Sequence, residues 1–212
     1  MCRCRADRFR SRSSSRFSSI PRGSASMVER RVEPSTATVG LMLPAFADVA
    51  ALTQTERAER WTLRGPDAAL DGLCAALGLA RPQRLRATVA GSRAAFWLGP
   101  DEILALAELG AAPVDFGAGS DGAAVEVGDK FVGLDLAGRR ADAVLASHCP
   151  QNLSLAAFPV GKVSRTLYAK VEIVLWRRGA SSFRIEVVRS FAPYLVAALT
   201  AAAEDLAALD RR

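Results

Sequence analysis

The chain has 212 residues, half of them hydrophobic, and carries a formal net charge of +6 at pH 7. Residues 1–26 hold seven arginines and one acid, whereas residues 27–212 hold 21 basic and 21 acidic residues. The main part of the chain therefore has no excess of cations for binding phosphates, and we expect no nucleic-acid partner. No uncharged apolar run reaches the roughly 18 residues of a membrane-spanning helix, so we expect no membrane partner either.

Residues 1–26 are rich in Arg and Ser and lack the apolar stretch of a secretory signal. Their composition fits a transit peptide, a disordered basic tail or translated sequence upstream of a true start at Met27. We favour the start at Met27, because a chain with 25 arginines and 3 lysines is typical of GC-rich bacterial coding. The four cysteines have neither disulfide nor metal-ligand spacing, which favours a reducing, cytoplasmic location in a bacterium.

The first half of the chain predicts an arm followed by a compact module. Residues 27–56 contain proline breakers and are expected to form an N-terminal arm lying on the body. Residues 57–110 are expected to form a βαββα module. Its elements are a strand at Arg60–Leu63, a turn at Gly65 into a helix ending near Leu77, a hairpin within 85–98 and a second helix over Glu102–Leu109.

The second half repeats this order after a Gly- and Ala-rich linker at residues 111–122. Within 123–212 we expect a strand at Phe131–Leu136, a turn at Gly138 into a helix over Arg139–Ser147, and a hairpin within 165–187. An amphipathic helix begins near Phe191. The prediction is an α+β fold of two duplicated βαββα modules of the split βαβ, ferredoxin-like kind.

Two motifs that carry chemistry elsewhere lack their context here. Gly117, Gly119 and Gly122 match the dinucleotide pattern G-x-G-x-x-G, but the residues after them predict a strand and not the helix that a pyrophosphate needs. His148 and Cys149 are neighbours in sequence, and adjacent side chains point apart, so a catalytic pair is not expected. The sequence therefore predicts no catalytic, cofactor-binding or metal-binding residues in this chain.

Arginine and tryptophan are concentrated on predicted strands. The default interpretation of the arginines is a solvated strand face, and the alternative is a surface for an acidic partner; they are Arg165, Arg177, Arg178, Arg184 and Arg189. The tryptophans favour core or interface positions over ligand platforms; they are Trp61, Trp97 and Trp176.

Beyond these patterns, the second half contains five runs in a fixed order and spacing, at 131–138, 143–150, 157–161, 165–176 and 183–191, followed by Tyr194-Leu195. With these runs the chain resembles the gamma subunit of heterotetrameric sarcosine oxidase, and the resemblance is densest in this half. In the first half, Trp61–Asp67 and Phe96–Glu102 resemble the same family. Two features depart from it: Gln151-Asn152 stand where the family typically carries an acid, and residues 1–26 have no counterpart.

The resemblance implies a fold similar to the folate-binding aminomethyltransferase domain and a non-catalytic role in oxidative demethylation of sarcosine to glycine. It also implies alpha, beta and delta partner subunits, which would hold FAD, FMN, NAD, tetrahydrofolate and zinc, while this chain binds no cofactor. The alternatives are an autonomous folate-dependent aminomethyltransferase-like enzyme and an RNA-modification factor of the same fold. The candidate subunit interface comprises Arg165, Trp176, Arg189, Phe191 and Tyr194.

Overall fold

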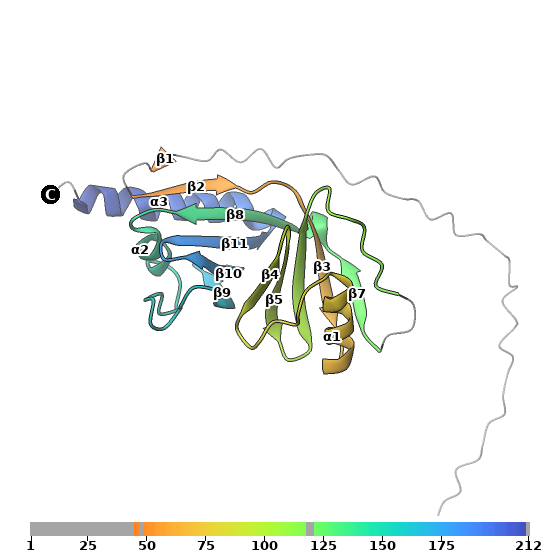
Figure 1. The fold of residues 1–212 in the computed structure, drawn as a ribbon. Coiled ribbons are helices and arrows are strands. Elements are labelled where there is room, and N and C mark those ends of the chain that lie inside the picture. Colours follow the sequence, from red (N-terminus) through yellow and green to blue (C-terminus); the bar gives the residue numbers. More distant parts are fainter. Residues whose placement is uncertain (1–44, 47–48, 118–120, 211–212) are drawn as a thin grey trace, which may run out of the picture. The chain divides into compact units, whose positions relative to one another are not determined.

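The computed structural model describes residues 45–46, 49–117 and 121–210, which form two antiparallel β-sheets with helices (Figure 1). The predicted tail at residues 1–26 and most of the predicted arm lie outside the described residues. The described residues form one compact unit. The α+β class predicted from the sequence is therefore confirmed.

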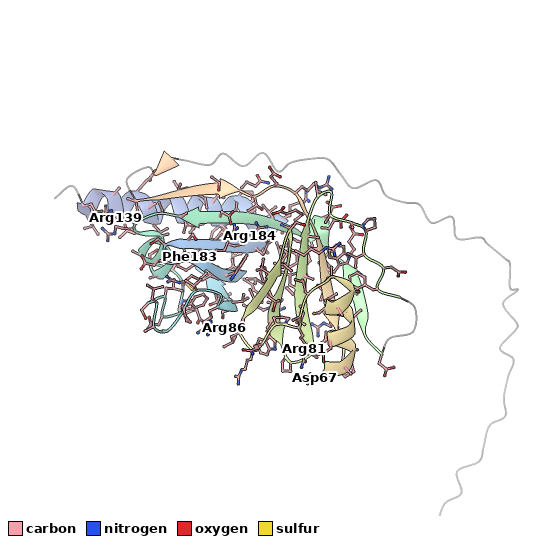
Figure 2. The ribbon with its side chains drawn as sticks, viewed as in Figure 1. Asp67, Arg81, Arg86, Arg139, Phe183 and Arg184 are labelled. Atoms are coloured by element: carbon pink, nitrogen blue, oxygen red, sulfur yellow. The ribbon has the colours of Figure 1, made fainter. Side chains whose placement is uncertain are left out.

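The first sheet has five strands in the order β4-β5-β6-β3-β7. Its strands are β3 (Ala58–Arg64), β4 (Ala87–Ala90), β5 (Arg93–Gly99), β6 (Glu102–Glu108) and β7 (Ala123–Glu126). Helix α1 (Asp67–Ala76) follows β3 and buries Leu70, Leu73 and Cys74 against the sheet. Arg81 binds Asp67 at 2.6 Å and Asp71 at 2.9 Å beside this helix (Figure 2), which ties the loop after α1 to its exposed side.

The second sheet has six strands in the order β1-β2-β8-β11-β10-β9. Its strands are β1 (Ala45–Phe46), β2 (Ala50–Gln54), β8 (Phe131–Ala137), β9 (Val163–Tyr168), β10 (Val171–Gly179) and β11 (Ser182–Val188). Helices α2 (Ala141–Ala146) and α3 (Ala192–Asp210) pack on it and contribute to the largest apolar cluster of the described residues. Two short 3-10 helices, η1 (Gly128–Lys130) and η2 (Arg189–Phe191), precede β8 and α3.

The predicted helix over Glu102–Leu109 is wrong, because this segment is strand β6. Its residues from Ile103 to Ala107 are all buried, with β5 on one side and β3 on the other. Alternate residues face two different apolar clusters: Ile103 packs in the cluster under α1, and Leu104 packs in the cluster that joins the two sheets. A strand buried on both faces is a continuous apolar run, which periodicity alone does not separate from a helix.

The second half also contains one more strand than the sequence predicts. The stretch from Val163 to Gly179 is two strands, β9 and β10, joined by a tight turn in which Ala169 adopts φ 51°. The predicted hairpin of β10 and β11 and the helix after it are confirmed. Each half therefore has a strand, a glycine turn, a helix and three further strands, and not the predicted βαββα order.

The two halves of the chain exchange strands between the sheets. Strand β2, which precedes the first half, pairs with β8 of the second sheet, and β7, which follows the linker, pairs with β3 of the first sheet. The observed sheets therefore do not follow the predicted boundaries between arm, modules and linker. Val114 and Phe116 of the predicted linker also pack against the first sheet, with Phe116 edge-on to Trp61 at 5.7 Å.

Gly65 and Gly138 occupy equivalent turns at the ends of β3 and β8. Their φ angles are +151° and +145°, which L side chains rarely adopt. An added Cβ at Gly65 would lie 2.9 Å from Cα of Gly122, and one at Gly138 would lie 2.6 Å from Cα of Ala50. Each glycine therefore makes room for backbone at the start of an exchanged strand, β7 for Gly65 and β2 for Gly138.

The two sheets meet through an apolar cluster. Phe96, Leu104 and Leu106 of the first sheet pack with Val163 and Val174 of the second. Strands β5 and β9 contribute directly to this contact. Burial of these side chains gives the described sheets a common core in addition to the core of each.

Among the described helices, the segment Arg189–Asp210 is the one long and apolar enough to cross a membrane by length and composition. Its apolar face packs against the six-stranded sheet through residues that include Leu195, Leu199 and Ala203, which are fully buried. A helix packed on a core passes the same test of length and composition, and these contacts pack one face of α3 on the sheet.

Candidate functional site

Three of the five predicted interface residues have partners inside the chain. Arg165 bonds Glu102 of the first sheet at 2.5 Å. The Trp176 ring lies 5.1 Å from that of Phe96 in the cluster between the sheets. Arg189 bonds Asp129 through both the carbonyl, at 2.8 Å, and the side chain, at 3.1 Å. These residues hold the two sheets and their connections together, and their role in assembly stays a prediction.

The other two predicted interface residues are exposed aromatics. Phe191 is 52% exposed in η2, and Tyr194 is 45% exposed in the first turn of α3. They follow Arg189 directly in the chain, so the structure places two large rings and one guanidinium group on one short segment. Aromatic side chains and arginine are enriched in protein interfaces, which makes this segment the best candidate for a docking surface.

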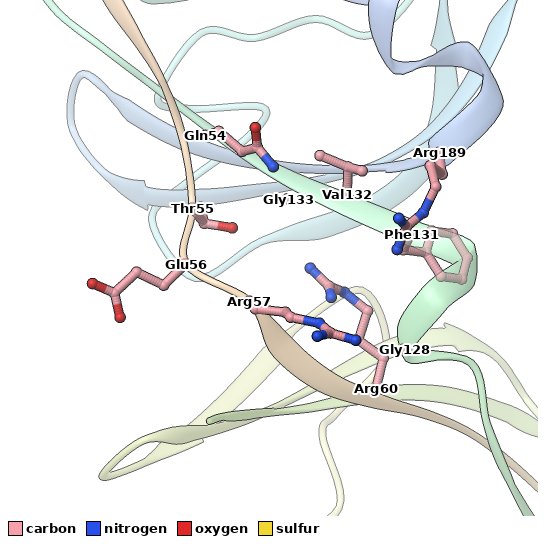
Figure 3. Close-up of a pocket in the computed structure, with 10 residues that line it drawn as sticks. All are labelled: Gln54, Thr55, Glu56, Arg57, Arg60, Gly128, Phe131, Val132, Gly133 and Arg189. Carbon is pink, nitrogen blue, oxygen red and sulfur yellow. The ribbon is translucent and has the colours of Figure 1, made fainter. Parts of the chain in front are cut away.

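A pocket of about 340 Å³ lies where the chain crosses twice between the sheets (Figure 3). One crossing is residues 55–57, between β2 and β3, and the other is residues 127–130, between β7 and β8. Arg57 of the first crossing bonds Asp129 of the second at 3.4 Å. The lining also includes Arg60, Phe131 and Arg189. Sequence reasoning missed this pocket, apart from Arg189.

A buried ion-pair network stands beside the pocket. Glu186 of β11 accepts hydrogen bonds from Nε of Arg60 at 2.8 Å and from Nε of Arg184 at 2.7 Å. The Glu186 side chain is fully buried, that of Arg60 is 3% exposed, and that of Arg184 is 14% exposed. Arg60 also donates to the carbonyl of Ala58 at 2.9 Å. Charges this deeply buried require such pairing, because desolvation of an unpaired charge is unfavourable.

The predicted solvated arginine face is wrong for Arg177, which is 1% exposed. Its guanidinium lies over the ring of Phe183 at 4.4 Å and donates to the carbonyls of Ala180, at 2.6 Å, and Leu153. Burial lowers the pKa of Arg177 from its ordinary value. Figure 2 shows Phe183 and Arg184 as neighbours on the same strand, where one packs in the core and the other belongs to the ion-pair network.

His148 and Cys149 have separate partners in the structure. Nδ1 of His148 lies 3.0 Å from the Ser147 hydroxyl, and its ring packs 5.4 Å from that of Tyr168. The Cys149 thiol is buried and lies 3.9 Å from the Thr166 hydroxyl. Burial also raises the pKa of Tyr168, whose hydroxyl donates to the carbonyl of Val144 at 3.2 Å.

The glycine motif at Gly117–Gly122 is described only in part. Residues 118–120 of the G-x-G-x-x-G match lie outside the described residues, and strand β7 follows directly after Gly122. No helix therefore begins after the motif, as predicted. In the described ranges, no group of three or more His, Cys, Asp and Glu side chains could hold a metal ion.

The Cys74 thiol predicts a pH dependence of stability. Burial of this thiol between α1, which carries it, and the sheet, with a smaller effect of the Asp71 carboxylate, raises its pKa from 9.0 to about 11. Between these pH values the unfolded chain loses this proton and the folded chain keeps it, so stability falls as pH rises. We expect urea unfolding from pH 7.5 to 10.5 to show a steeper decline for the wild type than for Cys74→Ala. The difference should reach at most about 1.4 kcal/mol per pH unit, and parallel profiles would contradict this assignment.

Taken together, the two antiparallel sheets and the helices packed on them define a mixed α/β protein with an Arg-lined pocket and an exposed aromatic segment. A profile of the family described as "Sarcosine oxidase, gamma subunit family" matches residues 65–205. The chain belongs to the sarcosine oxidase gamma subunit family.

Two relatives and one solved structure illustrate this membership. The sarcosine oxidase subunit gamma of an Arthrobacter species is 35% identical over 119 residues, covering 53% of this chain and 59% of the relative. That of Corynebacterium sp. strain P-1 is 36% identical over 131 residues, covering 58% and 64%. The heterotetrameric sarcosine oxidase from Corynebacterium sp. U-96, solved with pyrrole 2-carboxylate, contains a chain that matches with a TM-score of 0.64 and 28% identity. That match covers 74% of this chain and 84% of the other. The chain thus spans about six tenths of the length of the two sequence relatives.

Proposed function

We propose that this chain is the gamma-type subunit of a heterotetrameric sarcosine oxidase and docks the larger subunits without catalytic residues of its own. The observation that carries the proposal is the likeness to a chain of a heterotetrameric sarcosine oxidase over 84% of that chain. Family membership agrees with it and does not favour an autonomous aminomethyltransferase-like enzyme or an RNA-modification factor.

The proposal includes the other subunits and their cofactors. Alpha, beta and delta subunits are the partners, they hold FAD, FMN, NAD, tetrahydrofolate and zinc, and the complex works in the bacterial cytoplasm. The repeated order of strand, glycine turn, helix and three strands supports a duplicated architecture related to the folate-binding aminomethyltransferase fold. The assembled complex converts sarcosine to glycine, and this chain contributes binding surface to it.

Co-expression with the other subunits tests this function. A tagged form of the chain should recover a complex that produces hydrogen peroxide when sarcosine is added. The untagged subunits should elute together with it in size-exclusion chromatography. If the chain elutes alone under conditions in which the other subunits are folded, the subunit assignment is wrong.

The exposed aromatic segment should be a major part of the docking surface. Phe191→Asp places a charge where we propose that a partner desolvates the ring, and we expect affinity for the complex to fall at least about 30-fold. Leu109→Asp is a matched control, because Leu109 is similarly exposed, at 58%, and lies after β6. The measurement is surface plasmon resonance against the remaining subunits, with thermal melting to verify the fold. Equal affinities of the two variants would place the interface elsewhere.

A further inference from the structure

The surface beside the two chain crossings carries more positive than negative charge. Arg57 and Arg189 share one carboxylate, that of Asp129, at 3.4 and 3.1 Å. Behind them, the carboxylate of Glu186 is likewise shared by two arginines. Because two positive charges meet one negative charge in each group, each group keeps a net charge of +1.

The remaining charges nearby do not cancel this excess. Among the described residues that line the pocket, Glu56 is the one acid, and Figure 3 shows its side chain turned away from the arginines. Lys130 and Glu126 stand at the two ends of the second crossing, outside the lining, and their charges offset each other. The guanidinium groups of Arg57 and Arg60 instead lie toward the space between the crossings (Figure 3).

Arg57 is the arginine best placed to bind a partner. Its side chain is 35% exposed, compared with 3% for that of Arg60. Within the described part of the chain, its one hydrogen bond joins Nη2 to Oδ1 of Asp129 and is long, at 3.4 Å. The Nε and Nη1 atoms of Arg57 therefore keep donors for another acceptor, and the planar fork of a guanidinium fits a carboxylate.

The surroundings of Arg57 favour a protein partner over other anions. About a third of the Arg57 and Arg189 side chains is exposed, so a free small anion would stay largely in water, whereas small-molecule sites bury most of their ligand. Nucleic acid requires an excess of cations, but residues 27–212 hold 21 basic and 21 acidic residues. Arg189 also precedes the exposed Phe191 by two positions, so one partner segment can cover both the charge and the ring.

We propose that a partner protein inserts an acidic side chain between the two crossings, where its carboxylate accepts hydrogen bonds from Arg57. Apolar residues next to this acid in the partner pack on Phe191. This docking mode rests on the proposed function, since the partner is taken to be a larger subunit of the complex. It adds the chemistry of the partner segment, which is an Asp or Glu flanked by apolar side chains.

Two arginine-to-glutamine changes of equal charge test this docking mode. Arg57→Gln should weaken binding of the chain to the remaining subunits at least about tenfold, because the partner's carboxylate loses a charged donor. Arg86→Gln should leave this affinity unchanged, since Arg86 bonds the carbonyl of Val160 and does not line the pocket. Surface plasmon resonance measures both affinities. Added salt should weaken binding of the wild type more than that of Arg57→Gln.

Chemical crosslinking identifies the partner's acid directly. Arg57→Lys introduces an amine, and a carbodiimide joins this amine to a carboxylate in contact with it, forming an amide and taking up the water that is lost. In the assembled complex we expect an amide between position 57 and an Asp or Glu of another subunit, located by tandem mass spectrometry. The background is low because the chain has 3 lysines. Arg86→Lys is the control and should give no such link.

The possible results separate a wrong docking mode from a wrong function. If the wild-type chain does not bind the other subunits, the proposed function is wrong and the docking mode with it. If the wild type binds and Arg57→Gln binds equally well, Arg57 serves only its internal pair with Asp129 and the docking mode alone is wrong. Displacement of the subunits by inorganic phosphate or by a short RNA would also overturn it. If thermal melting shows that Arg57→Gln is unfolded, the crosslink at Arg57→Lys decides.

Discussion

Replacing Glu186 by Ala is expected to lower the free energy of unfolding by about 3–5 kcal/mol. The carboxylate is fully buried and bonds Arg60 of the other sheet at 2.8 Å and Arg184 at 2.7 Å. Its loss would leave the guanidinium of Arg60, which is 3% exposed, without a counter-charge in an environment of low polarity. Urea denaturation followed by circular dichroism measures the change.

Two further variants separate burial from charge. Glu172→Ala on the neighbouring strand removes an acid that is 67% exposed and 3.9 Å from Arg165, and it should change stability by less than about 1 kcal/mol. The triple variant Arg60→Met, Arg184→Met and Glu186→Leu removes all three charges of the network and should regain most of the lost stability. If Glu186→Ala lowered the free energy of unfolding as little as Glu172→Ala, the network would be exposed to solvent and not buried.

Replacing Gly138 by Ala is expected to lower the free energy of unfolding by about 3–5 kcal/mol, from backbone strain and displacement of a neighbouring strand. Its φ of +145° is unfavourable for alanine, and the new Cβ would lie 2.6 Å from Cα of Ala50 at the start of β2. Because both the turn and the strand are backbone, no side-chain rotation relieves the contact. Thermal and urea unfolding should both report the loss.

Gly72→Ala is the matched control for this substitution. Gly72 lies within helix α1, and an added Cβ meets nothing within 4 Å. Alanine there should raise the free energy of unfolding by about 0.5–1 kcal/mol, because it reduces the freedom of the unfolded chain and favours the helix. The free energy of unfolding should thus fall for Gly138→Ala and rise for Gly72→Ala. If both substitutions raised it, the close packing at Gly138 would be contradicted.

Local sequence patterns predicted most of the secondary structure in the second half. Alternation of apolar residues identified β10 and β11, and the spacing of Leu195, Leu199 and Ala202 fits the observed face of α3. Both glycine turns were also predictable, because Gly65 and Gly138 each separate a strand from a helix. The error at Glu102–Leu109 arose because a central strand covered on both faces carries no alternation.

The site was much less predictable, since its residues come together only through sheet pairing. Arg60 and Glu186 are 126 positions apart, and Arg57 and Asp129 are 72 apart. Along β11, the alternating Arg184 and Glu186 are typical of a strand face in water. That face is instead covered by residues of the other sheet. A Glu between two arginines on apolar strands was the available signal, but no spacing rule connects it with Arg60.

The exchange of strands between the sheets has a consequence for how the protein can be divided. A cut within residues 111–122 would give one fragment that carries β2, a strand of the other fragment's sheet, and a second fragment that carries β7. Each piece would expose unpaired backbone at a sheet edge and would hold a strand with no place in its own sheet. The two halves are thus interlocked, and neither can be transplanted as a self-sufficient domain.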